Sequence, residues 1–325
     1  MRVLVTGGAG YIGSTTAAVL LEAGHEVVVL DDLSNGHRDV VPAEATFIEG
    51  DVADPAAVDA ALATPVDACL HFAARIEVGA SMAHPEDTFA VNVGGAARLF
   101  ERLIAHRVER FVLSSTAAVY GIPAKVPISE DTSPDPESPY GESKLTVERM
   151  LPWLAEAHGL RWAALRYFNA AGATEGRGER HEPETHLIPR VLDVAAGRDE
   201  AVKVFGTDYP TADGTAVRDY VHVADLADAH VAALQAVDEG HDQLVCNLGT
   251  GIGASVREVV EVARRVTGRR IPVVEEERRA GDPPVLVASQ DRARRVLGWV
   301  PKRSYLNEII ASAWAEHPAR GVVGA

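Results

Sequence analysis

The chain has 325 residues, 47% of them hydrophobic and 24% charged, which is typical of a globular protein with a substantial core. Its formal net charge of −16 argues against a surface that binds nucleic acid or an anionic membrane. We see no apolar run near the roughly 18 residues of a membrane span and no signal peptide, and Cys69 and Cys246 resemble buried free thiols. We therefore expect a cytoplasmic protein.

The first half of the chain alternates short apolar runs with segments of helical pattern. Strands are predicted at Val3–Thr6, Glu26–Leu30, Thr46–Ile48, Asp67–Phe72, Arg110–Leu113 and Arg161–Tyr167. Helices are predicted at Tyr11–Leu21, Ala56–Ala63, Pro85–His106 and Pro139–His158. Pro152 should kink or end the last of these helices. The alternation indicates an α/β fold with a Rossmann-type, doubly wound parallel sheet.

The pattern changes after Asn169. A loop rich in Gly, Glu and Arg covers 172–184, and a second loop with Pro and Gly covers 206–214. Helices are predicted at His186–Ala196, Ala224–Val237, Ser255–Thr267, Asp291–Leu297 and Leu306–Glu316. We predict a Rossmann domain over 1–169 and a smaller α+β substrate-binding lobe over 170–325. A strand at Leu244–Leu248 could return to the first sheet.

A glycine-rich turn joins the first strand to the first helix. Gly8, Gly10 and Gly13 match G-x-G-x-x-G, and Gly7, Gly10 and Gly13 also match G-x-x-G-x-x-G. Such a turn lets a pyrophosphate approach the backbone and the N-terminus of the helix. The second strand ends at Asp31, whose carboxylate can bind ribose hydroxyls and would repel a 2′-phosphate, with Asp32 as a substitute. The sequence therefore predicts NAD rather than NADP.

The stretch SPYGESK at 138–144 places Tyr140 and Lys144 one turn apart on one helix face. Alone they could be a solvated surface pair. Thr116, however, ends a predicted sheet strand at the edge where ligands bind in open α/β folds. An ammonium and an oxidised nicotinamide nearby would favour the phenolate of Tyr140. These groups can remove a proton from a sugar alcohol while hydride leaves its carbon.

These motifs, taken together, resemble the extended short-chain dehydrogenase/reductase family, and within it the UDP-glucose (UDP-galactose) 4-epimerases. The similarity covers nearly the whole chain. The segments that carry it are TGGAGYIGS, HFAA at 71–74, SSTAAVYG at 114–121, SPYGESK, LRYFNAAGA at 165–173, ETHLIP at 184–189, FGTDYPTADGTAVRDYVHVADLA at 205–227 and RRAGDPP at 278–284. The 205–227 segment is the most specific, whereas YxxxK marks only the superfamily.

The resemblance implies roles for individual residues. Tyr140 would be the acid/base, Lys144 would lower its pKa and bind the nicotinamide ribose, and Thr116 would be the hydroxyl partner. The implied cofactor contacts are Gly7, Gly10, Tyr11, Ile12, Gly13, Asp31, Asp32, Asp51, Val52, Phe72, Ala73, Ala74, Asn92, Ser114, Tyr140, Lys144 and Tyr167. The implied substrate contacts are Thr116, Tyr140, Asn169, His186, Leu187, Val204, Phe205, Arg218, Arg279, Asp282 and Leu286.

Some of these residues have ordinary structural alternatives. Arg218 could form an ion pair with Asp219, and Arg279 and Asp282 could belong to a solvated loop. His181, Glu182 and His186 suggest metal ligands, but their loop shows no clear third one, so we expect no metal site.

The implied activity is the interconversion of UDP-galactose and UDP-glucose. The C4 hydroxyl is oxidised, the 4-keto sugar rotates, and hydride returns to its other face. NAD is regenerated in each cycle and should stay tightly bound. Relatives are commonly homodimers that pack the Tyr140 helix against its symmetry mate, and we expect the same here.

Other activities remain open on the same scaffold. A UDP-pentose or UDP-uronate 4-epimerase would need only a changed pocket. A sugar-nucleotide dehydratase is disfavoured because Ala117 and Ala118 stand where dehydratases carry acids. A non-catalytic NAD-sensing protein would not need to keep both Tyr140 and Lys144.

The chain departs from the family pattern at two places. In the stretch 75–81, Arg75 is the only cation and Ala80 replaces a glutamate. Leu286 stands where some members carry a tyrosine beside the C2 substituent of the sugar. The smaller side chain predicts room for N-acetylated UDP-hexosamines (UDP-GlcNAc and UDP-GalNAc).

Overall fold

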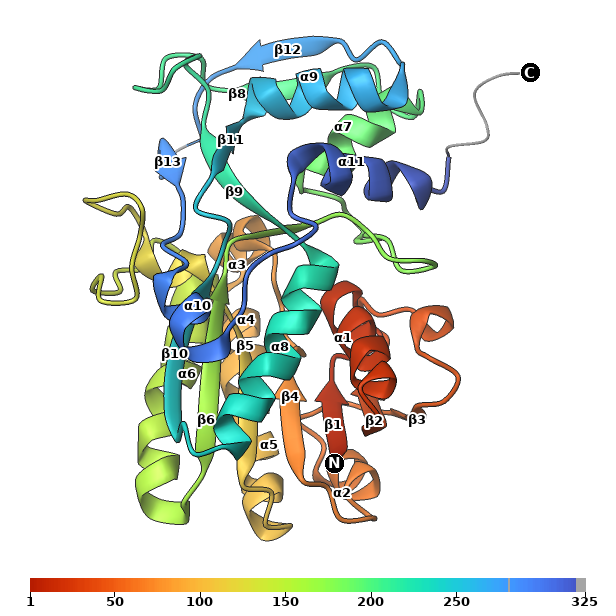
Figure 1. Cartoon of the computed structure of the whole chain (residues 1–325), viewed down its shortest axis with the longest axis vertical. Coiled ribbons are helices and arrows are strands. Elements are labelled where there is room, and N and C mark those ends of the chain that lie inside the picture. Colours follow the sequence, from red (N-terminus) through yellow and green to blue (C-terminus); the bar gives the residue numbers. More distant parts are fainter. Residues whose placement is uncertain (280, 320–325) are drawn as a thin grey trace.

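The computed structural model describes residues 1–279 and 281–319. Its largest element is a seven-stranded parallel sheet with the strand order β10-β6-β5-β4-β1-β2-β3 (Figure 1). The strands of this sheet are β1 (Arg2–Thr6), β2 (Glu26–Asp31), β3 (Thr46–Glu49), β4 (Ala68–His71), β5 (Arg110–Thr116), β6 (Arg161–Tyr167) and β10 (Gln243–Leu248). This confirms the Rossmann-type fold.

Helices cover both faces of this sheet because successive strand residues point to opposite sides. In β1, Val3 and Val5 pack toward α1 and α8, whereas Leu4 belongs to the core under α2, α5 and α6. All three valine and leucine side chains are fully buried. The helices of the two layers are α1 (Tyr11–Glu22), α2 (Pro55–Ala61), α5 (Ala96–Ala105), α6 (Pro139–His158) and α8 (Val223–Asp238).

Two sequence predictions in this part need correction. The single helix expected over 85–106 is three pieces: α4 (Pro85–Phe89), the π-helical turn η2 (Ala90–Gly95) and α5. The π turn places Asn92 toward α6, where its side chain hydrogen-bonds Ser143. Sequence periodicity does not reveal such a contact between distant segments. Pro152 does not end α6, which runs on to His158. Pro152 lies on the exposed side of α6, where water can satisfy the carbonyl that loses its partner.

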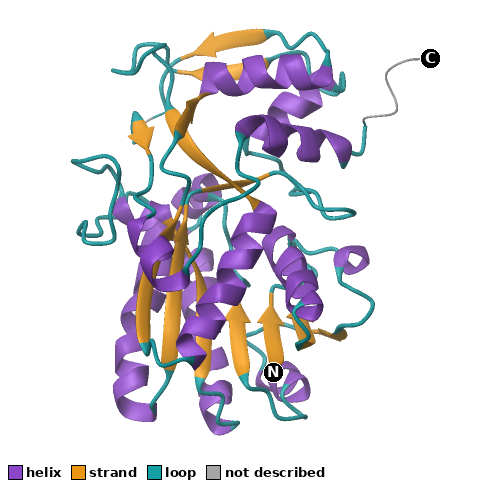
Figure 2. Ribbon diagram, viewed as in Figure 1, coloured by secondary structure: helices purple, strands orange, loops and turns teal. Residues whose placement is uncertain are grey.

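The remaining elements form the upper part of Figure 1 and the connections at the mouth of the sheet. Strand β9 pairs with β7, β11 and β13, and β12 pairs with β8. Figure 2 shows these short strands next to helices, which the contacts identify as α7, α9 and α11. The elements are α3 (Val78–Ala83), β7 (Asn169–Ala171), α7 (Leu187–Ala195), β8 (Val202–Phe205), β9 (Val217–His222), β11 (Gly253–Ser255), α9 (Val256–Thr267), β12 (Val273–Glu276), β13 (Val285–Leu286), α10 (Asp291–Leu297) and α11 (Leu306–Ala315), with the 3-10 turns η1 (Arg38–Val40) and η3 (Ala117–Tyr120).

The chain does not divide cleanly in space at residue 169. Helix α8 packs on α1, and β10 pairs with β6 in the large sheet, so residues of the second half complete the first layer system. The domain boundary at 169/170 stays a prediction, and Ala280 and residues 320–325 of the predicted lobe lie outside the described residues. Within the described ranges, no helix is both long and apolar enough to cross a membrane.

Candidate active site

A cleft of about 510 Å³ opens above the carboxyl ends of the parallel strands. It runs from the glycine-rich turn to β13, so both halves of the chain line it. Most of the predicted contacts lie on its wall: Gly7, Gly10, Tyr11, Ile12, Gly13, Asp31, Asp32, Asp51, Val52, Phe72, Ala73, Ala74, Ser114, Thr116, Tyr140, Lys144, Tyr167, Asn169, His186, Arg218 and Leu286. Asn92, Leu187, Val204, Phe205, Arg279 and Asp282 do not line it.

The glycine-rich turn has different reasons for its different glycines. Gly7 has φ +69°, and a Cβ there would lie 2.5 Å from the Ala73 nitrogen. A Cβ at Gly13 would overlap the Gly7 carbonyl oxygen, so both positions need glycine for packing. A Cβ at Gly10 meets only the Gly7 oxygen at 3.3 Å, and Gly10 caps α1 without a side-chain hydrogen bond. The open approach and the uncapped helix N-terminus both suit a pyrophosphate.

The two aspartates after β2 are already engaged with backbone amides. Asp31 is buried and accepts from the Ala9 and Leu33 nitrogens, both at 2.9 Å. Burial raises the pKa of Asp31, although the two backbone bonds oppose the shift. Asp32 accepts from the Ser34 nitrogen at 2.9 Å. A carboxylate has about four lone-pair sites, so both retain acceptor capacity for ribose hydroxyls.

The catalytic candidates come together from two elements. Ser138 caps α6 by accepting from the Gly141 nitrogen at 3.2 Å, and Pro139 takes the first helical position, so Tyr140 and Lys144 lie in the first turns. Lys144 Nζ donates to the Ser114 carbonyl on β5 at 2.9 Å. The Thr116 side chain, at the end of β5, interacts with the Tyr140 phenol and lowers its pKa. The structure therefore brings the three predicted residues into one cleft, and their catalytic roles stay a prediction.

The pKa values of this group follow burial. Burial raises the pKa of Tyr140 to about 12, although the Thr116 hydrogen bond lowers it. Burial also lowers the pKa of Lys144 to about 8, with Glu148 acting in the opposite direction. The causes of the Tyr140 shift are burial, the Thr116 hydrogen bond and the charge of Glu77, so the expected activation by the Lys144 ammonium stays a prediction. Positive charge from a bound cofactor would have to supply the rest.

Asn92 acts behind the cleft wall rather than on it. Its Nδ2 donates to the Arg75 carbonyl at 3.0 Å and to Ser143 Oγ at 2.9 Å, while its Oδ1 accepts from the Arg75 nitrogen at 2.7 Å. Ser143 in turn donates to the Tyr140 carbonyl at 2.7 Å. Asn92 therefore holds the 75–81 stretch against α6, and its predicted cofactor contact stays a prediction.

The 75–81 stretch also supports Tyr140. Ser81 Oγ accepts from the Tyr140 nitrogen at 3.2 Å and donates to the Val78 carbonyl at 2.7 Å. Arg75 lines the cleft. This contact of α3 with the start of α6 is not visible in the local sequence pattern.

Among the predicted UDP contacts, Arg218 lines the cleft, whereas Arg279 and Asp282 do not. Arg218 pairs with Asp282 and not with Asp219, which accepts from Thr250 and Gly251 instead. The guanidinium of Arg279 lies 4.0 Å from the centre of the Phe205 ring. Asp282 and Arg279 thus stand behind Arg218 and beside β8.

Leu187 and Val204 are further from the predicted role. Val204 is 1% exposed and faces the core of the upper elements, because strand residues alternate and Lys203 takes the outer face. Leu187 packs against the hydrophobic core around α7, α9 and α11.

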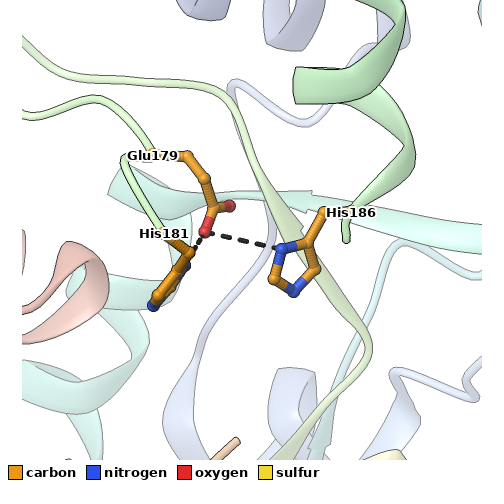
Figure 3. A group of neighbouring side chains, drawn as sticks. All are labelled: Glu179, His181 and His186. Atoms are coloured by element: carbon orange, nitrogen blue, oxygen red, sulfur yellow. Dashed lines mark hydrogen bonds and ion pairs between the residues drawn. The ribbon is translucent and has the colours of Figure 1, made fainter. Parts of the chain in front are cut away.

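Glu179, His181 and His186 lie close together and line the cleft (Figure 3). The sequence did not predict that Glu179 belongs to this group. Each offers one ligand atom, and these atoms lie within 4.8 Å of one another. The third candidate ligand is therefore Glu179 and not Glu182, which is exposed. Burial lowers the pKa of His186, but the hydrogen bond to Glu184 and the charge of Glu179 outweigh it and raise that pKa to about 9. Histidines five residues apart were the available signal.

Comparisons with known proteins identify the family of the chain. Residues 3–249 match the model of the NAD dependent epimerase/dehydratase family. The chain belongs to this family. It is 52% identical to the UDP-glucose 4-epimerase of Streptomyces lividans, over 97% of this chain and 96% of that protein. It is 48% identical to the UDP-glucose 4-epimerase of Halalkalibacterium halodurans, over 98% and 97% of the two chains.

A solved structure extends the similarity to three dimensions. The UDP-glucose 4-epimerase of Brucella ovis, in complex with NAD, is 46% identical and aligns with a TM-score of 0.94 over 97% of this chain and 98% of that chain. The resemblance to 4-epimerases within the family is confirmed by these relatives.

Proposed function

We propose that this family member is an NAD-dependent epimerase that interconverts UDP-galactose and UDP-glucose at C4. The observation that carries the proposal is the grouping of Tyr140, Lys144 and Thr116 in one cleft with the glycine-rich turn. The similarity to UDP-glucose 4-epimerases, at 48% and 52% identity, supports the substrate class.

The cleft fits NAD on the evidence of its own residues. Gly10 leaves room over an uncapped helix N-terminus for the pyrophosphate, and Asp31 offers acceptors to the ribose and opposes a 2′-phosphate. Asp51 and Val52 line the same end of the cleft. When bound, NAD supplies a reversible hydride acceptor that each cycle regenerates.

The protein side of the reaction is proton transfer at the sugar C4 oxygen. Tyr140 takes the hydroxyl proton during oxidation and returns it during reduction. Thr116 donates a hydrogen bond to the same C4 oxygen of the sugar. Lys144, held by the Ser114 carbonyl, supplies positive charge beside the phenol. Arg218 suits the diphosphate because a guanidinium fork binds phosphate oxygens in pairs.

The direct test is conversion of UDP-galactose to UDP-glucose by the purified protein. We expect wild-type turnover and a loss of about 1,000-fold in Tyr140→Phe, which keeps the ring but loses the proton carrier. Full activity in Tyr140→Phe, or activity restricted to UDP-pentoses or UDP-uronates across a substrate panel, would contradict the proposal.

The N-acetyl group of UDP-hexosamines is the open question at the sugar end. Leu286 lines the cleft and is half-buried. It is smaller than the tyrosine that some family members carry at this position, which leaves more room beside the sugar. We propose that UDP-N-acetylglucosamine is also a substrate and that Leu286→Tyr removes this turnover while UDP-galactose is still converted. A wild-type protein inactive on UDP-N-acetylglucosamine refutes this.

A homodimer through α6 and a cytoplasmic location accompany this function as proposals. On α6, the Trp153 side chain is 71% exposed, and in the proposed dimer α6 of the partner subunit would cover it. Cys69 and Cys246 are free and buried, which fits a reducing compartment. Light scattering of Trp153→Glu should show monomers where the wild type shows dimers.

A further inference from the structure

The segment between β7 and α7 brings three metal-type ligands to one point. The His181 Nδ1 contacts Glu179 Oε1, and His186 Nδ1 lies 3.6 Å from the same oxygen (Figure 3). His186 immediately precedes α7, so its backbone position is set by the start of that helix. Glu179 is nearly buried, with a side-chain exposure of 9%. Two imidazoles from one loop thus converge on one buried carboxylate.

We propose that Glu179, His181 and His186 form a site for a divalent transition metal of the zinc type. Zinc binds histidine nitrogen and carboxylate oxygen at about 2.0–2.2 Å in tetrahedral geometry. Ligand atoms of such a site lie a few ångströms apart, and all three here lie within 4.8 Å of one another. Imidazole ligands disfavour magnesium and calcium, which prefer oxygen. Three protein ligands leave the fourth position for water.

A cluster of ion pairs without metal is the competing arrangement. Glu184 Oε1 lies 2.9 Å from His186 Nδ1 and accepts from the His186 nitrogen at 2.6 Å. A carboxylate oxygen can accept hydrogen bonds from both imidazoles, so geometry alone does not exclude this arrangement. In the metal site, Glu184 keeps the backbone bond that orients His186. The experiment below separates the two arrangements.

The position of the cluster gives the metal a role. The segment that carries it is tied to the nucleotide end of the cleft: the Tyr11 hydroxyl donates to the Gly172 carbonyl at 2.5 Å. Further along, the Arg180 guanidinium bonds Asp39 at 2.8 and 3.0 Å, and the Arg180 carbonyl lies 3.3 Å from His37 Nε2. We call residues 172–186, between β7 and α7, the strap. A metal bound by Glu179, His181 and His186 would fasten this strap over the dinucleotide. Slower release of NAD follows, an effect that rests on the proposed function, whereas metal binding itself does not.

Titration of tag-free, chelator-treated protein with Co²⁺ tests the site, because histidine-bound Co²⁺ absorbs visible light. We expect one saturable absorbing site per chain that Zn²⁺ displaces. In His181→Gln and Glu179→Gln the site should weaken by more than about 100-fold, since losing a ligand costs more than losing an outer-shell partner. Glu182→Gln is the matched control in the same loop and should bind as the wild type does.

The outcomes decide between the two arrangements. No saturable Co²⁺ absorption in the wild type, or equal absorption in His181→Gln, overturns the metal site and leaves an ion-paired cluster. Circular dichroism and thermal unfolding check that each variant is folded, and Glu179→Gln gives a second, independent loss if His181→Gln unfolds. Failure of epimerase activity would leave the Co²⁺ result unaffected, so the two proposals fail separately.

The strap role has its own readout. The rate at which holoprotein loses NAD on dilution should fall by about 5-fold or more when Zn²⁺ is added, a coupling of the usual allosteric size. The effect should disappear in His181→Gln. An unchanged release rate in the presence of bound Zn²⁺ overturns the strap role.

Discussion

On two walls of the same cleft, the pKa values of ionisable groups shift in opposite senses. We call the wall with Tyr140 and Lys144 the catalytic wall and the wall with His186 the strap wall. At the catalytic wall, burial raises the pKa of Tyr140 to about 12 and lowers that of Lys144 to about 8, so both groups shift toward neutrality. At the strap wall, the hydrogen bond and charges of neighbouring carboxylates overcome burial and raise the pKa of His186 to about 9. There the groups shift toward the charged form.

The difference shows that depth alone does not set charge. Lys144 donates to an uncharged backbone carbonyl, whereas His186 has the Glu184 and Glu179 carboxylates beside it. A wall where burial moves pKa values toward the neutral forms suits proton transfer, because small changes in local charge then alter protonation. A wall of matched charges suits binding and fastening.

Among changes that leave Tyr140 itself in place, the largest expected effect is on kcat and comes from removing the Thr116 hydroxyl. Thr116→Val removes the hydrogen bond that lowers the phenol pKa, so the pKa rises further and proton transfer slows. We expect kcat to fall by about 100-fold and the alkaline shift of the pH–rate profile to be visible in steady-state assays. Thr116→Ser keeps the hydroxyl and should stay within a few-fold of wild type. Equal losses in both variants would mean that packing, not the hydrogen bond, is responsible.

The next effect is on stability and has an unusual sign. The folded-state pKa of Lys144, about 8, lies below its ordinary 10.5, so between these values the unfolded chain binds more protons. The burial penalty is fully present below pH 8, where it amounts to about 3 kcal/mol, and disappears as the pH rises toward 10.5. Lys144→Met should therefore be more stable than wild type by about 2 kcal/mol at pH 7, after about 1 kcal/mol for the lost hydrogen bond.

Urea unfolding of cofactor-free protein measures this difference. The advantage of Lys144→Met should shrink steadily between pH 8 and pH 10. Lys302→Met, at an exposed position, is the matched control and should show neither gain nor pH dependence. A destabilised Lys144→Met at pH 7 contradicts the claim that burial dominates at this wall.

The smallest effect has the opposite sign and comes from the strap wall. Glu184→Gln removes a charge partner of His186, whose side chain is 42% exposed, so solvent screens part of the interaction. We expect a loss of about 1 kcal/mol in unfolding free energy at pH 7, measured with chelator present. Glu182→Gln on the same loop should be neutral. If Glu184→Gln is more stable than the wild type, burial and not charge pairing dominates the strap wall, as it does the catalytic wall.

The local pattern of the first half predicted most of what the structure shows there. The glycine turn, the parallel strands and the pair Tyr140 and Lys144 are encoded by neighbours in sequence, since strand–turn–helix spacing fixes them. The second half was harder. Its strands β7, β8, β9, β11, β12 and β13 are short and were not recognised, because strands of two to six residues carry little periodicity and depend on partners distant in the chain.

The same limit applies to the site. Motif resemblance assigned Asn92 and Asp282 to ligand contacts, but their partners are Arg75, Ser143 and Arg218, which only the folded chain brings within reach. Glu179 was not recognised as a neighbour of His181 and His186 because a loop has no period from which side-chain convergence follows.

The sequence by itself thus determined the fold class, the nucleotide turn and the proton-transfer pair, which are local features with fixed spacing. The tertiary structure alone decided at which groups burial outweighs neighbouring charge and at which groups neighbouring charge outweighs burial, because that depends on what packs around them. Charge state follows from this surrounding, and it separates the catalytic wall from the strap wall of one cleft.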